Sequence, residues 1–445
     1  MSDLLIKNAH IIDPGLDMDM QGDILISEGK IECVGKLDGI TDVRILDASG
    51  LVACPGFIDL HCHLREPGFE NKETIESGSS AAAHGGYTTI CCMPNTNPPL
   101  DNIASLEYIK NTAAQKGKIR VLPVACVTKL RMGKEITEML ELSSAGCVGF
   151  SDDGSPVSNS RIMFIAMQYA AFLNLPIIDH CEDLELSHSG QVHDGWVAAR
   201  LGLQGIPAAA EESIVARDIA LAGITGAKLH ITHVSTSGSV DLIRSAKHKG
   251  IPITADVTPH HLTLTEEAVL KSCNRDNSFI AYNTAAKVNP PLRTEKDIEA
   301  LIAALNDGTI DVIATDHAPH SVEDKCCEFE AAAFGISGFE TSFGVLMMLV
   351  NENKIGLTTL IKSLTCNPAG IISRTYNNLG ALKVSSPADI VLLDLNRKWV
   401  VNTDKFLSKG KNTPFSGLNL RGMVVATLFK GKFIYQDKSL HITEK

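Results

Sequence analysis

Strand and helix patterns alternate along most of this 445-residue chain. Apolar runs of β-forming residues recur, and most are separated by segments with helical periodicity. This alternation predicts parallel strands joined by helical crossovers, with helices covering the faces of the sheet. Strands are expected over 57–63, 87–93, 119–127, 147–152, 176–181, 228–234, 252–258 and 311–316, and helices over 72–84, 102–116, 158–174, 211–221 and 294–306.

Eight such units predict a (β/α)8 TIM barrel over residues 56–375. A doubly wound open sheet is the alternative, but no G-x-G-x-x-G motif follows the first strand, which disfavours a dinucleotide-binding fold. Short strand patterns with glycine turns fill the first 55 residues and return after about residue 380. We therefore expect residues 1–55 and 376–445 to form one small β-sandwich domain from both ends of the chain.

The bulk composition narrows the function class. A net charge of −12 argues against nucleic acid as a main partner, although local arginines can still bind an anionic substrate. The longest apolar run, 345–350, is far shorter than the roughly 20 residues of a membrane span. The first residues lack the pattern of a signal peptide, and the twelve cysteines contain no C-x-x-C motif. A cytoplasmic protein with reduced thiols and no membrane partner is expected.

Metal-ligating side chains gather at the ends of the expected strands. His61 and His63 are two apart at the end of the first strand, so their imidazoles point the same way. Catalytic groups of a barrel lie at the carboxyl ends of its strands, and five of the eight ends carry nitrogen or oxygen ligands. Four histidines and two aspartates suit two divalent ions with one bridging carboxylate. The other candidates are Asp152 or Asp153, between which spacing does not choose, His180, His233 and Asp316.

A pair of divalent metal ions can activate a water molecule for hydrolysis. Two divalent ions about 3.5–4 Å apart lower the pKa of a shared water toward about 7 and so supply hydroxide at neutral pH. An aspartate beside that water can take its proton and pass it to a leaving nitrogen. The pattern therefore indicates hydrolysis of an amide, or the reverse reaction.

The same residues lie in motifs that resemble the dihydroorotases of the bacterial long-chain type, within the amidohydrolase superfamily. The resemblance covers nearly the whole chain. The motifs are DLHCHLREPG (59–68), KETIESG (72–78), GGYTTICCMPNTNP (85–98), FSDDG (150–154), DHCED (179–183), THVST (232–236), VTPHHL (257–262), NPPLR (289–293), ATDHAPH (314–320) and NTPF (412–415).

This resemblance implies a ligand set for zinc, with one or two ions per chain and two favoured. One ion would be held by His61 and His63, with Asp153 and Asp316 completing its shell. The second would be held by His180 and His233, with Asp153 bridging. Many relatives use a carboxylated lysine as the bridge, but FSDDG contains no lysine, so Asp153 takes that place.

The resemblance also implies the reaction, which is the reversible cyclisation of N-carbamoyl-L-aspartate to L-dihydroorotate in pyrimidine synthesis. Asp316 would be the general acid/base. Arg65 can fork onto the substrate carboxylate in a bidentate pair. Asn95 and His320 would complete this clamp, and the ring would be lined by Asn289, Phe334 and Gly335. Taken singly, Arg65 would be interpreted as a surface arginine, Asn95 as a turn former and His320 as a loop histidine.

Several alternatives stay open. A hydantoinase or allantoinase would share the layout, but its substrates lack the ring carboxylate that Arg65 would bind. A non-catalytic scaffold paralogue is the rival from another class, and such relatives lose metal ligands. A homodimer is expected, and association with aspartate transcarbamoylase is a further possibility, because some family members form that complex. Asp183 is the expected carboxylate partner of a ligating histidine, His260 and His261 are expected to be structural, and the long segment 318–338 is expected to be a lid or binding loop.

Overall fold

The computed structural model describes residues 3–270, 281–374 and 376–443. Its centre is a barrel of short parallel strands in two arrays, β6-β7-β8 and β9-β12-β13-β14. Single backbone bridges link Ala125 to Phe150, Phe150 to Ile177, and Cys62 to His317, so the two arrays close into a ring. The strands are β6 (Phe57–Cys62), β7 (Tyr87–Cys92), β8 (Arg120–Pro123), β9 (Ile177–Asp179), β12 (Leu229–Ile231), β13 (Ile253–Val257) and β14 (Val312–Ile313).

The fourth expected strand, 147–152, is wrong as a regular strand. Only Phe150 bridges to both of its neighbours. The chain turns immediately afterwards, because the Asp152 carboxylate accepts hydrogen bonds from the backbone N–H groups of Val127 and Thr128, at 2.9 and 3.0 Å. A side chain on Gly149 would lie 2.8 Å from Ile178 Cδ1 and 3.2 Å from the carbonyl oxygen of Pro176, so glycine lets this segment pack closely against its neighbour.

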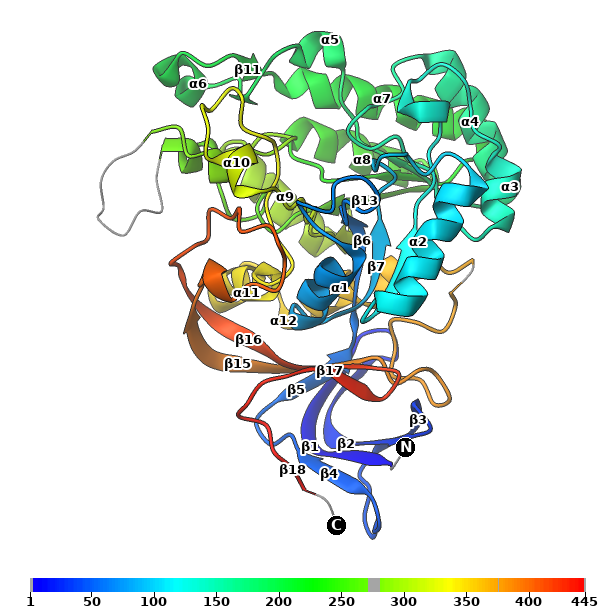
Figure 1. Ribbon diagram of the computed structural model, residues 1–445, viewed down its shortest axis with the longest axis vertical. Coiled ribbons are helices and arrows are strands. Elements are labelled where there is room, and N and C mark those ends of the chain that lie inside the picture. Colours follow the sequence, from blue (N-terminus) through cyan, green and yellow to red (C-terminus); the bar gives the residue numbers. More distant parts are fainter. Residues whose placement is uncertain (1–2, 271–280, 375, 444–445) are drawn as a thin grey trace.

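Helices surround the barrel, and the five expected ones are present with ends shifted by a few residues (Figure 1). Thr74 and Asn102 begin two of them by accepting a hydrogen bond from the backbone N–H three residues ahead, which satisfies a free helical donor. The main helices are α1 (Ile75–His84), α2 (Ile103–Lys116), α4 (Ser160–Leu173), α7 (Ala208–Thr225), α8 (Ser237–His248), α9 (Glu295–Asp307), α11 (Ser342–Asn351) and α12 (Leu357–Leu364). Shorter helices are α3 (Met139–Ser144), α5 (Leu184–Ser187), α6 (Trp196–Leu201), α10 (Val322–Lys325) and α13 (Cys366–Ile371).

Both ends of the chain build the β-sandwich domain at the bottom of Figure 1, where the two termini lie. The strand order is β17-β16-β15-β5-β1-β2-β3, and β4 pairs with β1 and β18. The first half of β1 pairs with β4 and its second half with β5, so β1 changes neighbours midway. These strands are β1 (Leu4–Asp13), β2 (Met18–Ser27), β3 (Lys30–Gly35), β4 (Arg44–Asp47), β5 (Val52–Pro55), β15 (Ile390–Val400), β16 (Asn419–Phe429), β17 (Lys432–Gln436) and β18 (Ile442–Thr443).

The sandwich and the barrel are joined by packing and by specific bonds. Residues of α1 and α11 pack against β16. Thr427 Oγ1 donates to the carbonyl of Ala83 at 2.7 Å, and Arg120 pairs with Asp389 at 2.9 Å. The segment between β15 and β16, in orange and red, rises from the sandwich along the barrel toward α10 (Figure 1). C-terminal residues can therefore contribute to the mouth of the barrel.

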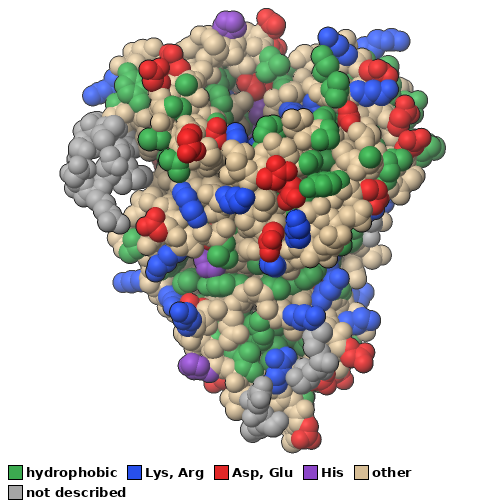
Figure 2. Space-filling model, in the orientation of Figure 1, with side chains coloured by type: hydrophobic (Ala, Val, Ile, Leu, Met, Phe, Trp, Pro, Cys, Tyr) green, Lys and Arg blue, Asp and Glu red, His purple; other side chains and the backbone are tan. Residues whose placement is uncertain are grey.

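Acidic and basic side chains are interspersed over the face shown in Figure 2 and do not form a field of one sign. That face therefore has no extended basic surface for nucleic acid, which is consistent with the net charge of −12. Among the described helices, none has the length and apolar character needed to cross a membrane.

Candidate active site

The imidazoles of His61 and His63 lie at the carboxyl end of β6, with ring centroids 5.3 Å apart. Two carboxylates face them. His61 Nε2 lies 3.3 Å from Asp153 Oδ1 and 3.6 Å from Asp316 Oδ1. His63 Nε2 lies 3.1 Å from Asp316 Oδ1 and 3.6 Å from Asp153 Oδ2. Side chains from three distant segments therefore converge on one small volume.

The two neighbouring aspartates of the FSDDG motif have separate positions. Asp153 faces the histidines, whereas the Asp152 carboxylate bonds to residues 127 and 128. This division follows from the turn after Phe150, which directs successive side chains to opposite sides.

His180 and His233 form the other side of the cluster. His180 Nδ1 lies 2.9 Å from His233 Nε2 and 3.7 Å from Asp153 Oδ1. His233 Nε2 lies 3.9 Å from the same Asp153 oxygen. Asp153 is thus central, with imidazoles on both sides.

The backbone is strained at two of these positions and is held there by buried groups. His233 has φ 37° and Asp316 has φ 44°, in the left-handed region that non-glycine residues rarely adopt. The N–H of His233 donates to Asp256 Oδ1 at 2.7 Å, and the other Asp256 oxygen lies 2.9 Å from His230 Nε2. Residue Thr315, which precedes Asp316, donates from its N–H and its hydroxyl to Asp59, at 2.8 and 2.6 Å.

The donor set fits a divalent metal ion. Two groups, His61–His63–Asp316 and His61–Asp153–His233, have ligand atoms that all lie within 4.8 Å of one another. Both ring nitrogens of His61 are buried and lack a hydrogen-bond partner among the described residues. A buried polar atom without a partner is costly, and a metal bond would remove that cost. Imidazole and carboxylate are ligands that zinc binds.

The electrostatics also favour a cation. Burial alone would raise the pKa of Asp153, yet His61 and His233 hold it well below its usual range. Burial likewise opposes ionisation of Asp316, but the hydrogen bond from His63 and the neighbouring imidazoles hold its pKa well below the ordinary value. Both carboxylates are therefore ionised at neutral pH.

Glu182 orients His180, whereas Asp183 is the residue predicted from the sequence for this role. His180 Nε2 lies 2.9 Å from Glu182 Oε2, and Asn289 Nδ2 donates to the same oxygen at 2.9 Å. Burial raises the pKa of Glu182, but the hydrogen bond and the charge of His180 outweigh burial and bring it to about 2. Asp183 instead begins α5 by accepting bonds from the N–H groups of Glu185 and Leu186. The expectation for Asp183 is wrong because the chain turns into α5 at this residue.

We expect Glu182→Gln to lower zinc affinity by about 10- to 100-fold, because the lost charge leaves the His180 ring less basic and less firmly oriented. Competition with a chelating dye would measure zinc affinity directly. Glu185→Gln, at an exposed position three residues further on, is the matched control and should bind zinc like the wild type. Equal zinc affinity in both variants would contradict the orienting role.

The predicted substrate residues lie around one cavity of about 230 Å³. Arg65 donates from Nε to the carbonyl of Pro319 at 3.2 Å, and its Nη2 lies 3.2 Å from His320 Nε2. Asn95 bonds to the candidate metal ligands, with Oδ1 2.9 Å from His63 Nδ1 and Nδ2 3.3 Å from Asp153 Oδ2. Apart from the deeper His61, every predicted site residue lines this cavity: His63, Arg65, Asn95, Asp153, His180, His233, Asn289, Asp316, His320, Phe334 and Gly335.

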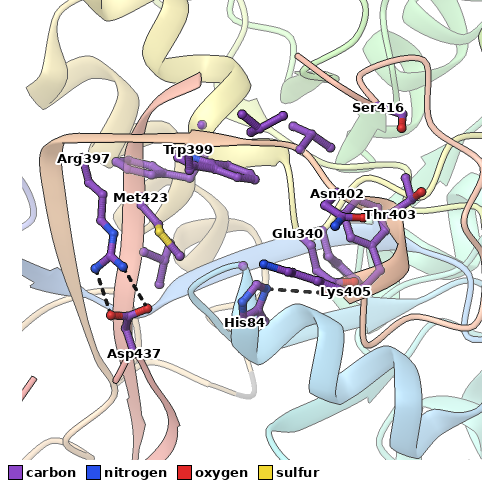
Figure 3. Close-up of a pocket in the computed structure, with 18 of the residues that line it drawn as sticks. His84, Glu340, Arg397, Trp399, Asn402, Thr403, Lys405, Ser416, Met423 and Asp437 are labelled. Atoms are coloured by element: carbon purple, nitrogen blue, oxygen red, sulfur yellow. Dashed lines mark hydrogen bonds and ion pairs between the residues drawn. The ribbon is translucent and has the colours of Figure 1, made fainter. Parts of the chain in front are cut away.

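A larger cavity of about 820 Å³ lies between the barrel and the β-sandwich (Figure 3). It contains none of the predicted site residues. Two ion pairs occupy its walls, Arg397 with Asp437 at 2.8 Å and His84 with Glu340 at 3.3 Å. The cluster of candidate metal ligands is therefore in the smaller cavity, at the mouth of the barrel.

Comparison with known proteins identifies the family. A curated protein named dihydroorotase, from Thermoanaerobacter sp. (strain X514), is 49% identical over 434 residues, which cover 97% of each chain. The chain belongs to the dihydroorotase family. A second dihydroorotase, from Syntrophus aciditrophicus (strain SB), is 46% identical over 98% of this chain and 99% of its own. A family model described as Dihydro-orotase-like matches residues 50–239.

The fold of this dihydroorotase-family chain is also similar to solved structures of hydantoinases. An L-hydantoinase (dihydropyrimidinase) from Arthrobacter aurescens matches with a TM-score of 0.87 and 26% identity, over 98% of this chain and 97% of its own. A D-hydantoinase structure matches with a TM-score of 0.84 and 23% identity, over 99% and 97% of the two chains. The expected TIM barrel with a β-sandwich is confirmed, as are the family and the class of cyclic amide hydrolase.

Proposed function

We propose that this chain is a zinc-dependent dihydroorotase, which interconverts N-carbamoyl-L-aspartate and L-dihydroorotate in pyrimidine (UMP) synthesis. The observation that carries the proposal is the cavity itself, where side chains from seven separate motifs meet around two ionised aspartates. Relatives named dihydroorotase, at 44 to 49% identity, support the same substrate.

The substrate carboxylate fits the side of the cavity that carries Arg65. Burial lowers the pKa of Arg65, but a guanidinium remains cationic at neutral pH. Its Nε is used by the carbonyl of Pro319, which fixes the plane of the fork and leaves Nη donors for the substrate. Burial, followed by the charge of Arg65, brings the pKa of His320 to about 3, so this ring is neutral and can donate only one hydrogen bond.

The chain's own residues can bind, orient and move a proton. His61, His63, His180 and His233 would hold the metal with Asp153 and Asp316. When bound, a divalent metal supplies a water of lowered pKa, which provides hydroxide near neutral pH. In the hydrolytic direction, ionised Asp316 accepts the proton of the attacking water and then donates it to the departing ring nitrogen. In cyclisation, Asp316 accepts the proton of the ureido nitrogen as that nitrogen attacks the carboxyl carbon, and then passes the proton to the carboxyl oxygen, which departs as hydroxide when its C–O bond breaks.

The test is substrate preference. We expect the purified protein to convert L-dihydroorotate with a much higher kcat/KM than hydantoin or allantoin, because only dihydroorotate has the carboxylate that Arg65 pairs with. Arg65→Met should remove this advantage and raise the KM for dihydroorotate by about 100-fold or more, since it leaves a buried carboxylate unpaired. Faster turnover of hydantoin by the wild type would favour the hydantoinase alternative.

The scaffold alternative would require lost ligands, whereas all six ligand residues are present and close together. The proposal includes two zinc ions per chain.

Four further expectations stay predictions. They are a homodimer, association with aspartate transcarbamoylase, a cytoplasmic location, and the domain bounds at residues 55 and 376.

A further inference from the structure

Asn412, in the C-terminal segment that rises from the β-sandwich, uses every hydrogen-bonding position of its side-chain amide. Nδ2 donates to the carbonyls of Ala318 and Gly335, at 3.1 and 3.0 Å. Oδ1 accepts from the N–H of His320 and the hydroxyl of Ser337, both at 2.9 Å. The residue is 7% exposed, so water cannot readily replace these bonds.

These four partners belong to the two arms of the loop 318–338. One arm carries Ala318 and His320, and the other carries Gly335 and Ser337. The arms also pair with each other, since the N–H of Ala318 donates to the carbonyl of Ile336 at 2.8 Å. The N–H of Ser337 donates to the backbone carbonyl of Asn412 at 2.7 Å, so side chain and backbone of this one residue tie both arms together.

The segment that carries Asn412 approaches the loop so closely that no side chain fits between them. A Cβ on Gly410 would lie 2.5 Å from Pro319 Cβ and 2.6 Å from Ser337 Oγ. A Cβ on Gly335, at φ 138°, would lie 2.7 Å from the Ala318 carbonyl oxygen. The arms are therefore closely packed as well as hydrogen-bonded.

Two buried lysines hold the opposite side of the loop. Lys325 Nζ donates to the carbonyl of Ala333 at 2.6 Å and to that of Lys287 at 3.2 Å. Lys287 Nζ lies 4.5 Å from the centroid of the Phe334 ring, and the Lys287 carbonyl accepts from the N–H of Gly335 at 2.9 Å. The loop is thus fixed from both sides, which argues that it is a rigid wall of the cavity rather than a lid.

We propose that Asn412 is a positioning residue, which sets the wall formed by His320 and Gly335 at the distance that the substrate carboxylate and ring require. This rests on the proposed function, in which those two residues contact substrate. Asn412 does not line the cavity, and it lies far along the chain from the metal ligands. Its loss should therefore weaken substrate binding without removing the metal.

The test compares Asn412→Asp with Asn402→Asp. The first variant keeps the shape and the two acceptor bonds but places a carboxylate oxygen against two carbonyls. The second changes an exposed asparagine of the same segment, whose Oδ1 accepts from the N–H of Asp404. We expect Asn412→Asp to raise the KM for dihydroorotate by about tenfold or more, with kcat within a few-fold and zinc content unchanged, and Asn402→Asp to match the wild type. An unchanged KM, or a parallel loss of zinc, would overturn the proposal.

Hydrogen exchange provides a readout that needs no turnover. Backbone amides of residues 318–338 should exchange faster in Asn412→Asp and in the smaller variant Asn412→Ala than in the wild type and the control. Unchanged exchange in both variants would overturn the anchoring role whatever the substrate is. A wild-type protein that does not act on dihydroorotate would instead contradict the proposed function and leave the exchange result to stand separately.

Discussion

Replacing Asp316 with asparagine should lower kcat for dihydroorotate by about 100- to 10,000-fold, the range that a lost general acid/base gives. The carboxylate is ionised, and its Oδ1 lies 3.1 Å from His63 Nε2, so it stands beside the site where a metal-activated water would form. Asparagine has nearly the same shape and can still offer a carbonyl oxygen, but it cannot accept and release a proton. The loss should therefore appear mainly in kcat.

The matched control is Asp311→Asn, at the opposite end of the same barrel strand. Asp311 pairs with Lys247 at 2.6 Å and accepts from the N–H of Ala255, so it supports structure away from the cavity. We expect this control to lower thermal stability while kcat stays within a few-fold of the wild type. Zinc content, thermal melting and steady-state kinetics should be measured on both variants. A kcat near the wild-type value in Asp316→Asn would contradict the proton-transfer role.

Removing the metal should have an effect at least as large. Treatment with a chelator is expected to abolish measurable turnover, and added zinc is expected to restore it, because none of the described side chains in the cavity can generate hydroxide at neutral pH without a metal. The fold should persist, since the barrel and sandwich have their own apolar cores. The melting temperature should fall, however, because a ligand present at 100 times its Kd contributes about 2.7 kcal/mol to stability.

Zinc stoichiometry sharpens this experiment. We expect two ions per wild-type chain and one in His180→Asn, which keeps the His61 and His63 pair but loses a ligand of the second ion. His188→Asn, at an exposed position after α5, is the control and should retain two. Full turnover from protein that holds no metal would contradict the mechanism, and a single ion in the wild type would contradict the two-metal arrangement alone.

Much of the fold could be predicted because periodicity is a local property. The two-residue repeat places His61 and His63 on one face, and helical periodicity locates α1, α2, α4 and α9 within a few residues. The fourth strand could not be predicted as it is, because its shortness depends on a bond from Asp152 to a neighbouring segment. Local pattern carries no information about such partners.

The candidate site shows the same division. The structure brings together eleven predicted residues around one cavity, and nine of them lie in the family motifs. Whether Glu182 or Asp183 contacts His180 depends on the exact residue at which α5 begins. A shift of that residue by one position would exchange the two roles. Contacts between segments remote in sequence could not be predicted. They include the hydrogen bonds of Asn95 to His63 and Asp153, the bond of Asn289 to Glu182, and the contacts of Asn412. The NTPF motif was the one available signal for Asn412, but the motif by itself assigns no partner.

The split sandwich has a consequence for biosynthesis. As the chain leaves the ribosome, β5 emerges long before β15, its antiparallel neighbour. During translation of the barrel, this edge must therefore stay unpaired or be covered by a chaperone. Asn412 emerges later still, so the wall of the catalytic cavity is finished only when synthesis is nearly complete. A stalled nascent chain that ends between residues 340 and 400 would carry all six candidate metal ligands but would lack Asn412. If the proposed roles hold, such a chain would bind metal before its substrate wall is correctly positioned.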